Sequence, residues 1–203
     1  MYKIYCFDFD GTITSKDTLL EFISFVKGRM HLLLGFVIYS PFLILMECHL
    51  YPNYKIKEKI FAYFFKDMSE DCFNSYCYEF ASCCYNTIIR PKAIEEINKA
   101  ISEKTSIFIV SASIDNWVAP FFTSLIDKGI KVKVLGTKIE IKDGVVTGKF
   151  LSANCYGAEK VCRIKNELKE PRNNYYITAY GDSRGDKEML DYADKGFYKP
   201  FRH

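Results

Sequence analysis

The sequence has no block of basic residues. Its 28 Lys and Arg are interleaved with 25 Asp and Glu, which leaves a formal net charge of +3 over 203 residues. A nucleic-acid-binding protein usually concentrates positive charge on one face, so we expect no nucleic-acid partner. There is also no internal repeat or low-complexity tract, and 49% of the residues are hydrophobic. These features exclude a disordered or fibrous chain and indicate a globular protein.

The N-terminus lacks the charged, apolar and small-residue regions of a secretory signal. We therefore expect a cytoplasmic protein whose eight cysteines are free thiols. The CxxC pairs of a zinc ribbon or finger are missing as well. A zinc site would have to use side chains without that spacing: Cys72, Cys77, Cys83, Cys84 and His49. Since Cys77 and Cys84 recur with Phe73 and Phe80 on one helical face, packing as small apolar residues is the better interpretation.

No Asp, Glu, Lys or Arg occurs from Met30 to Met46, a run of seventeen residues. A membrane-spanning helix needs ~20 apolar residues, and this run is interrupted by Gly35 and by Ser40–Pro41. Proline removes a backbone donor and bends or ends a helix. We therefore predict a buried or interfacial helical hairpin bent near Ser40–Pro41, rather than a membrane span.

Short apolar runs alternate with helical patterns along the chain. Three of these runs have the composition of strands buried on both faces: residues 3–9, 106–110 and 175–180. Further elements are predicted as helices at 91–103 and 115–128, a strand at 131–135, and a hairpin at 137–150 with its turn at Asp143–Gly144. The pattern predicts an α/β fold with a Rossmann-like parallel sheet flanked by helices.

Residues 14–90 differ from the rest of the chain. They are rich in Phe, Tyr and Leu at helical spacing, contain five of the eight cysteines and include no convincing buried strand. We interpret this segment as an all-helical cap subdomain inserted into a catalytic core made of residues 1–13 and 91–203.

Acidic and hydroxyl side chains follow each predicted buried strand. Asp8 and Asp10 lie at the end of the first, Ser111 follows the second, and Asp182 and Asp186 follow the third. The carboxyl ends of parallel strands meet at one edge of a sheet, so these side chains should share one crevice. Four adjacent carboxylates would raise one another's pKa unless a cation neutralised them. Mg²⁺, which takes few carboxylates and keeps sites for phosphate oxygens, is favoured over Ca²⁺.

The stretch FDFDGTIT, residues 7–14, suits chemistry at phosphorus. An aspartate can attack phosphorus and form an aspartyl-phosphate. In a regular strand Asp10 would point away from Asp8, but a turn at Gly11–Thr12 lets both acids face the substrate. One acid is then placed to attack and the other to handle the leaving-group proton, with Gly11 and Thr12 offering donors to the phosphoryl oxygens.

These residues resemble the four ordered motifs of the haloacid dehalogenase superfamily. The DxDGT motif matches Asp8–Thr12, the Ser or Thr after a hydrophobic strand matches Ser111, the lysine that opens a helix matches Lys160 in GAEKV, and GDSxxD matches Gly181–Asp186. The resemblance covers the chain outside the helical insert. Two alternatives stay open, because Ser113 and Lys165 lie close to Ser111 and Lys160 in the sequence.

The resemblance implies a role for each matching residue. Asp8 is the nucleophile and a Mg²⁺ ligand, while Asp10 is the general acid and base and binds the metal through its backbone carbonyl. Ser111 and Lys160 bind the phosphate, and Lys160 also offsets the charge of Asp8. Asp182 is the carboxylate metal ligand, and Asp186 is its partner in the metal's outer shell or through a bridging water.

The helical insert resembles the phosphoserine phosphatase-like branch of the superfamily. In that branch an acidic residue at the place of Asp17 reaches the substrate from the cap, although Asp17 is equally suited to cap a helix that begins near Thr18. A weaker likeness, to bacterial phosphatidylglycerophosphate phosphatases, includes the apolar run in the cap and the ending GFYKPFRH. It implies a lipid phosphate substrate and peripheral contact with the inner face of a membrane.

We therefore expect a Mg²⁺-dependent phosphomonoester hydrolase that acts on a small phosphoester such as phosphoserine, or on a lipid phosphate. One alternative is a phosphotransferase that uses the same intermediate. The other is a non-catalytic, membrane-associated module, which the apolar run would suit.

Overall fold

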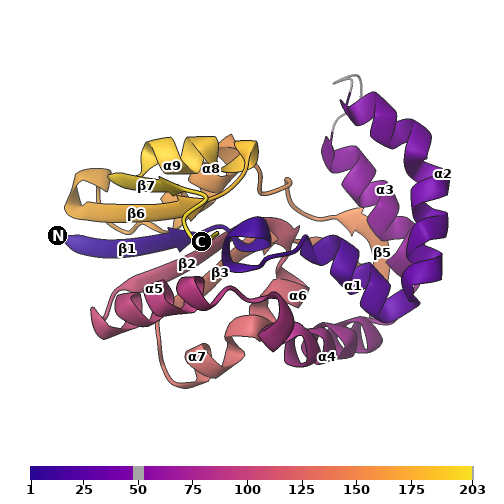
Figure 1. Cartoon of the computed structure of the whole chain (residues 1–203), viewed down its shortest axis with the longest axis horizontal. Helices are drawn as coiled ribbons and strands as arrows, with labels where there is room; N and C mark the ends of the chain where they lie inside the picture. Colours follow the sequence, from indigo (N-terminus) through magenta and orange to yellow (C-terminus); the bar gives the residue numbers. More distant parts are fainter. Residues whose placement is uncertain (48–52, 203) are drawn as a thin grey trace.

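The computed structural model describes residues 1–47 and 53–202, and the side chains outside 42–53 and 203. Its centre is a five-stranded parallel sheet with the order β3-β2-β1-β6-β7 (Figure 1). The strands are β1 (Tyr2–Phe7), β2 (Ser106–Ile114), β3 (Val132–Thr137), β6 (Tyr175–Gly181) and β7 (Lys195–Tyr198). The predicted α/β class is confirmed. Sequence reasoning did not foresee β7, a short edge strand with mostly exposed side chains.

Helices cover both faces of the sheet (Figure 1). On one face lie α8 (Ala158–Glu167) and α9 (Lys187–Tyr192), and on the other α5 (Pro91–Ser102) and α7 (Thr123–Asp127). The predicted single helix over 115–128 is wrong. It is divided into α6 (Asp115–Val118), a 3-10 turn η2 (Ala119–Phe122) and α7, since Pro120 within this stretch has no backbone N–H to continue the α-helical pattern.

Among the described residues, four α-helices lie between β1 and α5: α1 (Thr18–Lys27), α2 (Arg29–Glu47), α3 (Asn53–Phe65) and α4 (Glu70–Ile88). The chain leaves and re-enters the core through an antiparallel bridge between Thr14 and Ile89. The aromatic core of these helices is continuous with the sheet side of the molecule, because the Phe22 ring stacks on Trp117 of α6 with centroids 5.0 Å apart. The helical segment and the sheet therefore share one hydrophobic core.

The predicted hairpin is present as β4 (Ile139–Lys142) and β5 (Val145–Phe150), with its turn at Asp143–Gly144. Both turn residues have positive φ, as a tight two-residue hairpin turn requires. The hairpin is not part of the five-stranded sheet. It packs on α3, where the rings of Phe61 and Phe150 lie 5.9 Å apart.

The predicted hairpin does not turn at Ser40–Pro41, because α2 continues through Pro41 to Glu47. A residue other than proline at position 41 would donate its N–H to the carbonyl of Val37. The hydroxyl of Ser40 donates to that carbonyl instead, at 2.9 Å, which supplies the missing hydrogen bond and lets the helix continue.

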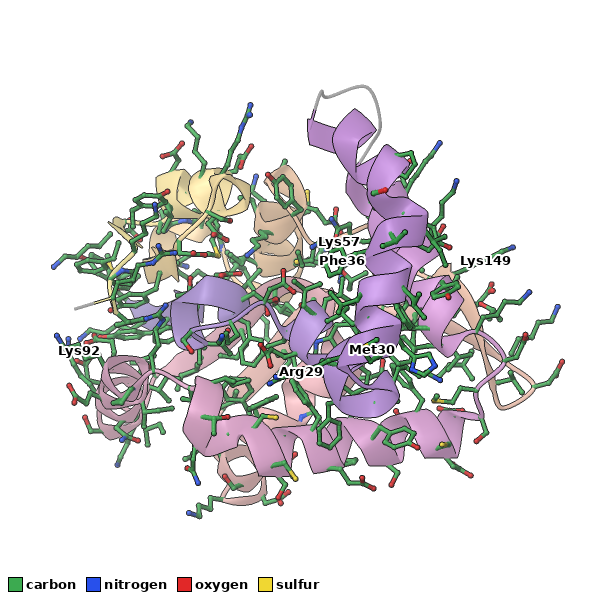
Figure 2. The ribbon with its side chains drawn as sticks, turned by 45° about the vertical axis from the view of Figure 1, so that its right-hand side comes forward. Arg29, Met30, Phe36, Lys57, Lys92 and Lys149 are labelled. Carbon is green, nitrogen blue, oxygen red and sulfur yellow. The ribbon has the colours of Figure 1, made fainter. Side chains whose placement is uncertain are left out.

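The outer side of α2 is apolar and open to solvent. Met30 and Val37 are each 71% exposed, and Leu33, Leu34 and Ile38 are more than half exposed (Figure 2 labels Met30 and Phe36 on this helix). Within 1–47 and 53–202, no helix is both long and apolar enough to cross a bilayer.

Candidate active site

Three aspartates meet at the carboxyl ends of β1 and β6. Asp8 directly follows β1, while Asp182 and Asp186 follow β6. One carboxylate oxygen from each lies within 4.8 Å of the others. Among the described residues this is the only cluster of His, Cys, Asp and Glu with metal-site geometry. The described cysteines, including Cys72, Cys77, Cys83 and Cys84, are free thiols, and His49 lies outside the described residues.

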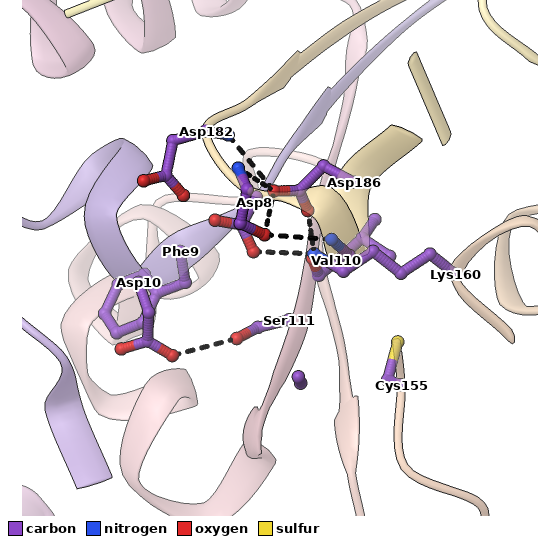
Figure 3. Close-up of polar contacts among 12 residues, drawn as sticks. Asp8, Phe9, Asp10, Val110, Ser111, Cys155, Lys160, Asp182 and Asp186 are labelled. Atoms are coloured by element: carbon purple, nitrogen blue, oxygen red, sulfur yellow. Dashed lines mark hydrogen bonds and ion pairs between the residues drawn. The ribbon is translucent and has the colours of Figure 1, made fainter. Parts of the chain in front are cut away.

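Lys160 connects two of these acids (Figure 3). Its side chain, from the first turn of α8, is only 2% exposed. The ammonium donates to Asp8 Oδ1 at 2.6 Å, to Asp186 Oδ1 at 2.5 Å and to the carbonyl of Val110 at 2.8 Å. The alternative residue, Lys165, places its ammonium over the ring of Tyr192 instead. The structure therefore brings Lys160 to the acids, as the motif match implies.

Burial and charge act against each other in this cluster. Burial raises the pKa of Asp8 to about 7, Lys160 opposes the rise, and the charge of Asp186 adds to it. Burial also disfavours the charged form of Lys160, but Asp8 and Asp186 outweigh it, and the pKa of Lys160 is raised. Burial works to raise the pKa of Asp186 too, yet Lys160 holds that pKa below its ordinary value. Three carboxylates against two cations, Lys160 and the Arg202 that pairs with Asp182, leave a net negative charge that a further cation could neutralise.

Asp10 is not part of this cluster, and its carboxylate accepts hydrogen bonds from four donors. Its Oδ1 accepts from the backbone N–H of Thr18 at 2.7 Å and from the Thr18 hydroxyl at 2.5 Å. Its Oδ2 accepts from Ser113 at 2.5 Å and from Ser111 at 3.5 Å. The indole N–H of Trp117 donates to the Thr18 hydroxyl at 3.2 Å. The beginning of α1 and the end of β2 together fix this carboxylate.

The two serines do not occupy equivalent places. Ser113 makes the short contact with Asp10, whereas Ser111 is fully buried and its hydroxyl accepts from the N–H of Ser113 at 3.0 Å. Which of the two would bind phosphate stays a prediction, because neither is among the residues that line the cavity.

Gly11 is required at the turn after β1 for two reasons. Its φ is +78°, in the region that favours glycine, and a Cβ there would lie 2.5 Å from Asp182 Oδ2. Thr12, next in the chain, is 1% exposed and does not line the cavity. Its hydroxyl has no hydrogen-bond partner among the described residues.

A cavity of about 320 Å³ opens beside the acids. From the sheet side it is lined by Asp8, Asp10, Gly11, Lys160 and Asp182, and from the helical side by Ser15, Lys16, Asp17 and Lys57. Asp17 fits both sequence interpretations, since it lines this cavity and its Oδ1 accepts from the N–H groups of Leu19 and Leu20 at the start of α1. Sequence reasoning missed Lys16 and Lys57, which belong to no motif.

Comparison with known proteins identifies the family. A model of the haloacid dehalogenase-like hydrolases matches residues 6–191. The chain belongs to this family. Protein CicA of Caulobacter vibrioides (strain NA1000 / CB15N) is 31% identical over 200 residues, which cover 98% of this chain and 86% of CicA.

Solved structures show that this member has the fold of phosphoserine phosphatase-like haloacid dehalogenases. A protein of unknown function from Bordetella pertussis Tohama I superposes with a TM-score of 0.79 at 16% identity, over 94% of this chain and 86% of that one. A phospho-aspartyl intermediate analogue of phosphoserine phosphatase gives a TM-score of 0.58 at 20% identity, over 97% and 85% of the two chains. The predicted membership of the haloacid dehalogenase superfamily is confirmed. The likeness to the phosphoserine phosphatase-like branch is confirmed at the level of the fold.

Proposed function

We propose that the protein is a Mg²⁺-dependent phosphomonoesterase that works through an aspartyl-phosphate on Asp8. The observation that supports this most strongly is the convergence of Asp8, Asp182 and Asp186, with Lys160 hydrogen-bonded to two of them. Carboxylate oxygens are the ligands that Mg²⁺ prefers, and the three carboxylates outnumber the cations beside them, Lys160 and Arg202. When bound, Mg²⁺ would neutralise charge on the phosphoryl oxygens.

Asp8 and Asp182 would hold the ion through their carboxylates, Asp10 through its backbone carbonyl and Asp186 directly or through water. In the first step a carboxylate oxygen of Asp8 forms a bond to phosphorus as the bond from phosphorus to the leaving oxygen breaks. Asp10 gives its proton to the departing alcohol. In the second step Asp10 takes a proton from water, whose oxygen attacks the phosphorus and releases inorganic phosphate and the Asp8 carboxylate.

The remaining groups would bind the phosphoryl oxygens. Lys160 is positioned for this because it lines the cavity beside Asp8. The backbone N–H groups at Gly11 and Thr12 would assist, together with the hydroxyl of Ser111 or Ser113. All three N–H groups of the Lys160 ammonium already donate, to Asp8, Val110 and Asp186, so binding a phosphoryl oxygen would exchange one of these hydrogen bonds.

We further propose that residues 14–90 act as a cap that selects the substrate and excludes water from the aspartyl-phosphate. The helical side of the cavity carries charges of both signs, Lys16 and Lys57 against Asp17. Such a lining suits a small phosphoester with charged groups of its own, of which phosphoserine is an example.

A lipid phosphate is the second candidate substrate, and one observation favours it. The apolar outer side of α2 would suit peripheral contact with a membrane. Flotation with anionic liposomes separates the two candidates: a membrane-acting enzyme floats and hydrolyses a lipid phosphate in the vesicles, whereas the small-substrate enzyme stays in the dense fraction.

Phosphate release from p-nitrophenyl phosphate and from a panel of metabolites, with and without Mg²⁺, tests the proposal. We expect turnover only with the metal, and Asp8→Asn should lower it on the order of 10³-fold or more. Asp127→Asn, an exposed aspartate on α7, is the matched control and should keep wild-type activity. Absence of turnover on every phosphoester, or full activity in Asp8→Asn, would contradict the proposal.

The same assay with added alcohols separates a phosphatase from a phosphotransferase. A phosphatase releases inorganic phosphate in proportion to substrate consumed at every alcohol concentration. If most of the phosphoryl group appeared on the alcohol, the acceptor would be the alcohol rather than water.

A further inference from the structure

The segment Lys199–Arg202, which follows β7, lies against the strands that carry the acids. The N–H of Lys199 donates to the carbonyl of Gly181 at 2.7 Å, at the end of β6. The ring of Phe201 stacks on Tyr180 of β6, with centroids 5.4 Å apart, and lies 6.4 Å from Phe7 of β1. In Figure 1 the end of the chain, marked C, accordingly lies beside the tip of β1. The position of this segment is therefore tied to the two strand ends that form the site.

These anchors place Arg202 on Asp182. Its guanidinium donates to Asp182 Oδ2 and forms an ion pair with it. The three clustered acids have different cationic partners, since Asp8 and Asp186 both accept from Lys160. Within the described part of the chain, Asp182 accepts a side-chain hydrogen bond from Arg202 and from no other donor.

We propose that Arg202 is a positioning residue that orients the carboxylate of Asp182 toward the cation site. This inference rests on the magnesium site of the proposed function. A carboxylate has two oxygens with about four lone-pair sites between them, so a guanidinium on Oδ2 leaves capacity for a metal ion. The backbone of Gly11 packs closely on the same carboxylate, and the two neighbours together limit its rotation.

Arg202 also brings a positive charge near the cation. Orienting Asp182 favours cation binding, whereas this charge repels the cation. The Arg202 side chain is 39% exposed, so water and salt screen its repulsion of the ion. The directional restraint on Asp182 is not screened in this way. Orientation therefore outweighs repulsion, and removing the guanidinium should weaken metal binding.

Calorimetric titration of the protein with Mg²⁺, in the absence of substrate, measures this effect directly. Loss of an outer partner of a metal ligand costs about 10- to 100-fold in affinity, which is the expected weakening for Arg202→Ala. Arg202→Lys keeps the charge without the planar guanidinium and should give an intermediate affinity. Lys199→Gln is the control: its ammonium lies over the ring of Tyr198, so the variant should bind Mg²⁺ like the wild type.

Thermal unfolding without Mg²⁺ shows whether each variant is folded, and the rise in Tm on adding Mg²⁺ repeats the comparison independently. Wild-type or tighter Mg²⁺ affinity in folded Arg202→Ala would overturn the inference and identify Arg202 as a bystander or a competitor. If Arg202→Ala does not fold, Arg202→Lys decides, because wild-type affinity in that variant overturns the inference. A wild-type protein that binds no Mg²⁺ would contradict the proposed function as well.

Discussion

At the scale of single residues, Lys160 is the cation on which two buried carboxylates depend. Replacing it by Met would leave Asp8 and Asp186 in a buried position without a positive partner. Breaking a buried ion pair in this way costs about 3–5 kcal/mol. We expect Lys160→Met to lower the free energy of unfolding by that amount in urea titrations with a chelator present.

Lys165→Met is the matched control, because it removes a lysine from the exposed side of the same helix. Its free energy of unfolding should stay within about 0.5 kcal/mol of the wild type. Equal destabilisation by the two variants would show that Lys160 contributes through its helix and not through its carboxylate partners.

The residues that the sequence identifies at this scale are those next to strand ends. Asp8, Asp10, Asp182 and Asp186 could be grouped in advance because parallel strands align their carboxyl ends. Lys57 and Arg202 could not, since each reaches the site through packing of distant segments. No local sequence pattern shows that Arg202 lies beside Asp182, because this contact depends on where Phe201 packs.

At the scale of elements, Asp17 at the start of α1 has two candidate roles, capping the helix and contacting the substrate, and two substitutions distinguish them. Asparagine is about as good as aspartate at an N-cap, whereas alanine costs typically about 1 kcal/mol. We expect Asp17→Asn to keep wild-type stability and Asp17→Ala to lose about that amount in urea unfolding.

Activity then tests the substrate role of Asp17. If its charge contacts the substrate, both variants lose phosphatase activity through a raised KM, although only one is destabilised. Wild-type kinetics in Asp17→Asn would leave Asp17 with the capping role alone.

The first half of β6 and the residue before β7 are connected through Asp194. Its Oδ2 accepts from the N–H of Ile177 at 2.7 Å and from Arg172 at 2.8 Å. Partial burial works to raise the pKa of Asp194, but these two donors outweigh it and lower the pKa below the ordinary 3.8. A carboxyl whose pKa is lowered by folding contributes stability above its unfolded pKa and loses that contribution as the pH falls through the folded value.

Asp194→Asn should therefore lower the free energy of unfolding by about 1 kcal/mol between pH 5 and 7. This figure is smaller than that of a buried ion pair because the Asp194–Arg172 pair is partly exposed. The difference from wild type should shrink as the pH falls below 3.8. Urea unfolding of both proteins across this range measures it. A difference that is independent of pH would show that ionisation of Asp194 is not the cause.

Strands that are buried on both faces could be predicted from the sequence, and exposed ones could not. The apolar runs that became β1, β2 and β6 were identified from sequence because both of their faces are covered. The edge strand β7 was missed because Lys195–Tyr198 is largely exposed and has no apolar run. The continuity of α2 was missed because it depends on the Ser40 hydroxyl compensating for Pro41.

At the scale of the whole molecule, the helical segment and the sheet share a core at Trp117, the only tryptophan in the chain. Its fluorescence therefore reports on this junction, whereas far-ultraviolet circular dichroism reports on all helices. A shared core favours a single cooperative transition. We expect the two signals to give coincident midpoints in urea. An earlier fluorescence transition would show that the helical segment detaches before the core unfolds.

The central claim is that Asp8 becomes phosphorylated during turnover, and trapping that species tests it most directly. The protein is mixed with a hydrolysed phosphomonoester and Mg²⁺, quenched in acid within the turnover time, digested and examined by mass spectrometry. We predict one phosphoryl group on the peptide that contains Asp8 and none in Asp8→Asn. Steady turnover with no phosphorylated peptide, or the same label in Asp8→Asn, would contradict the account.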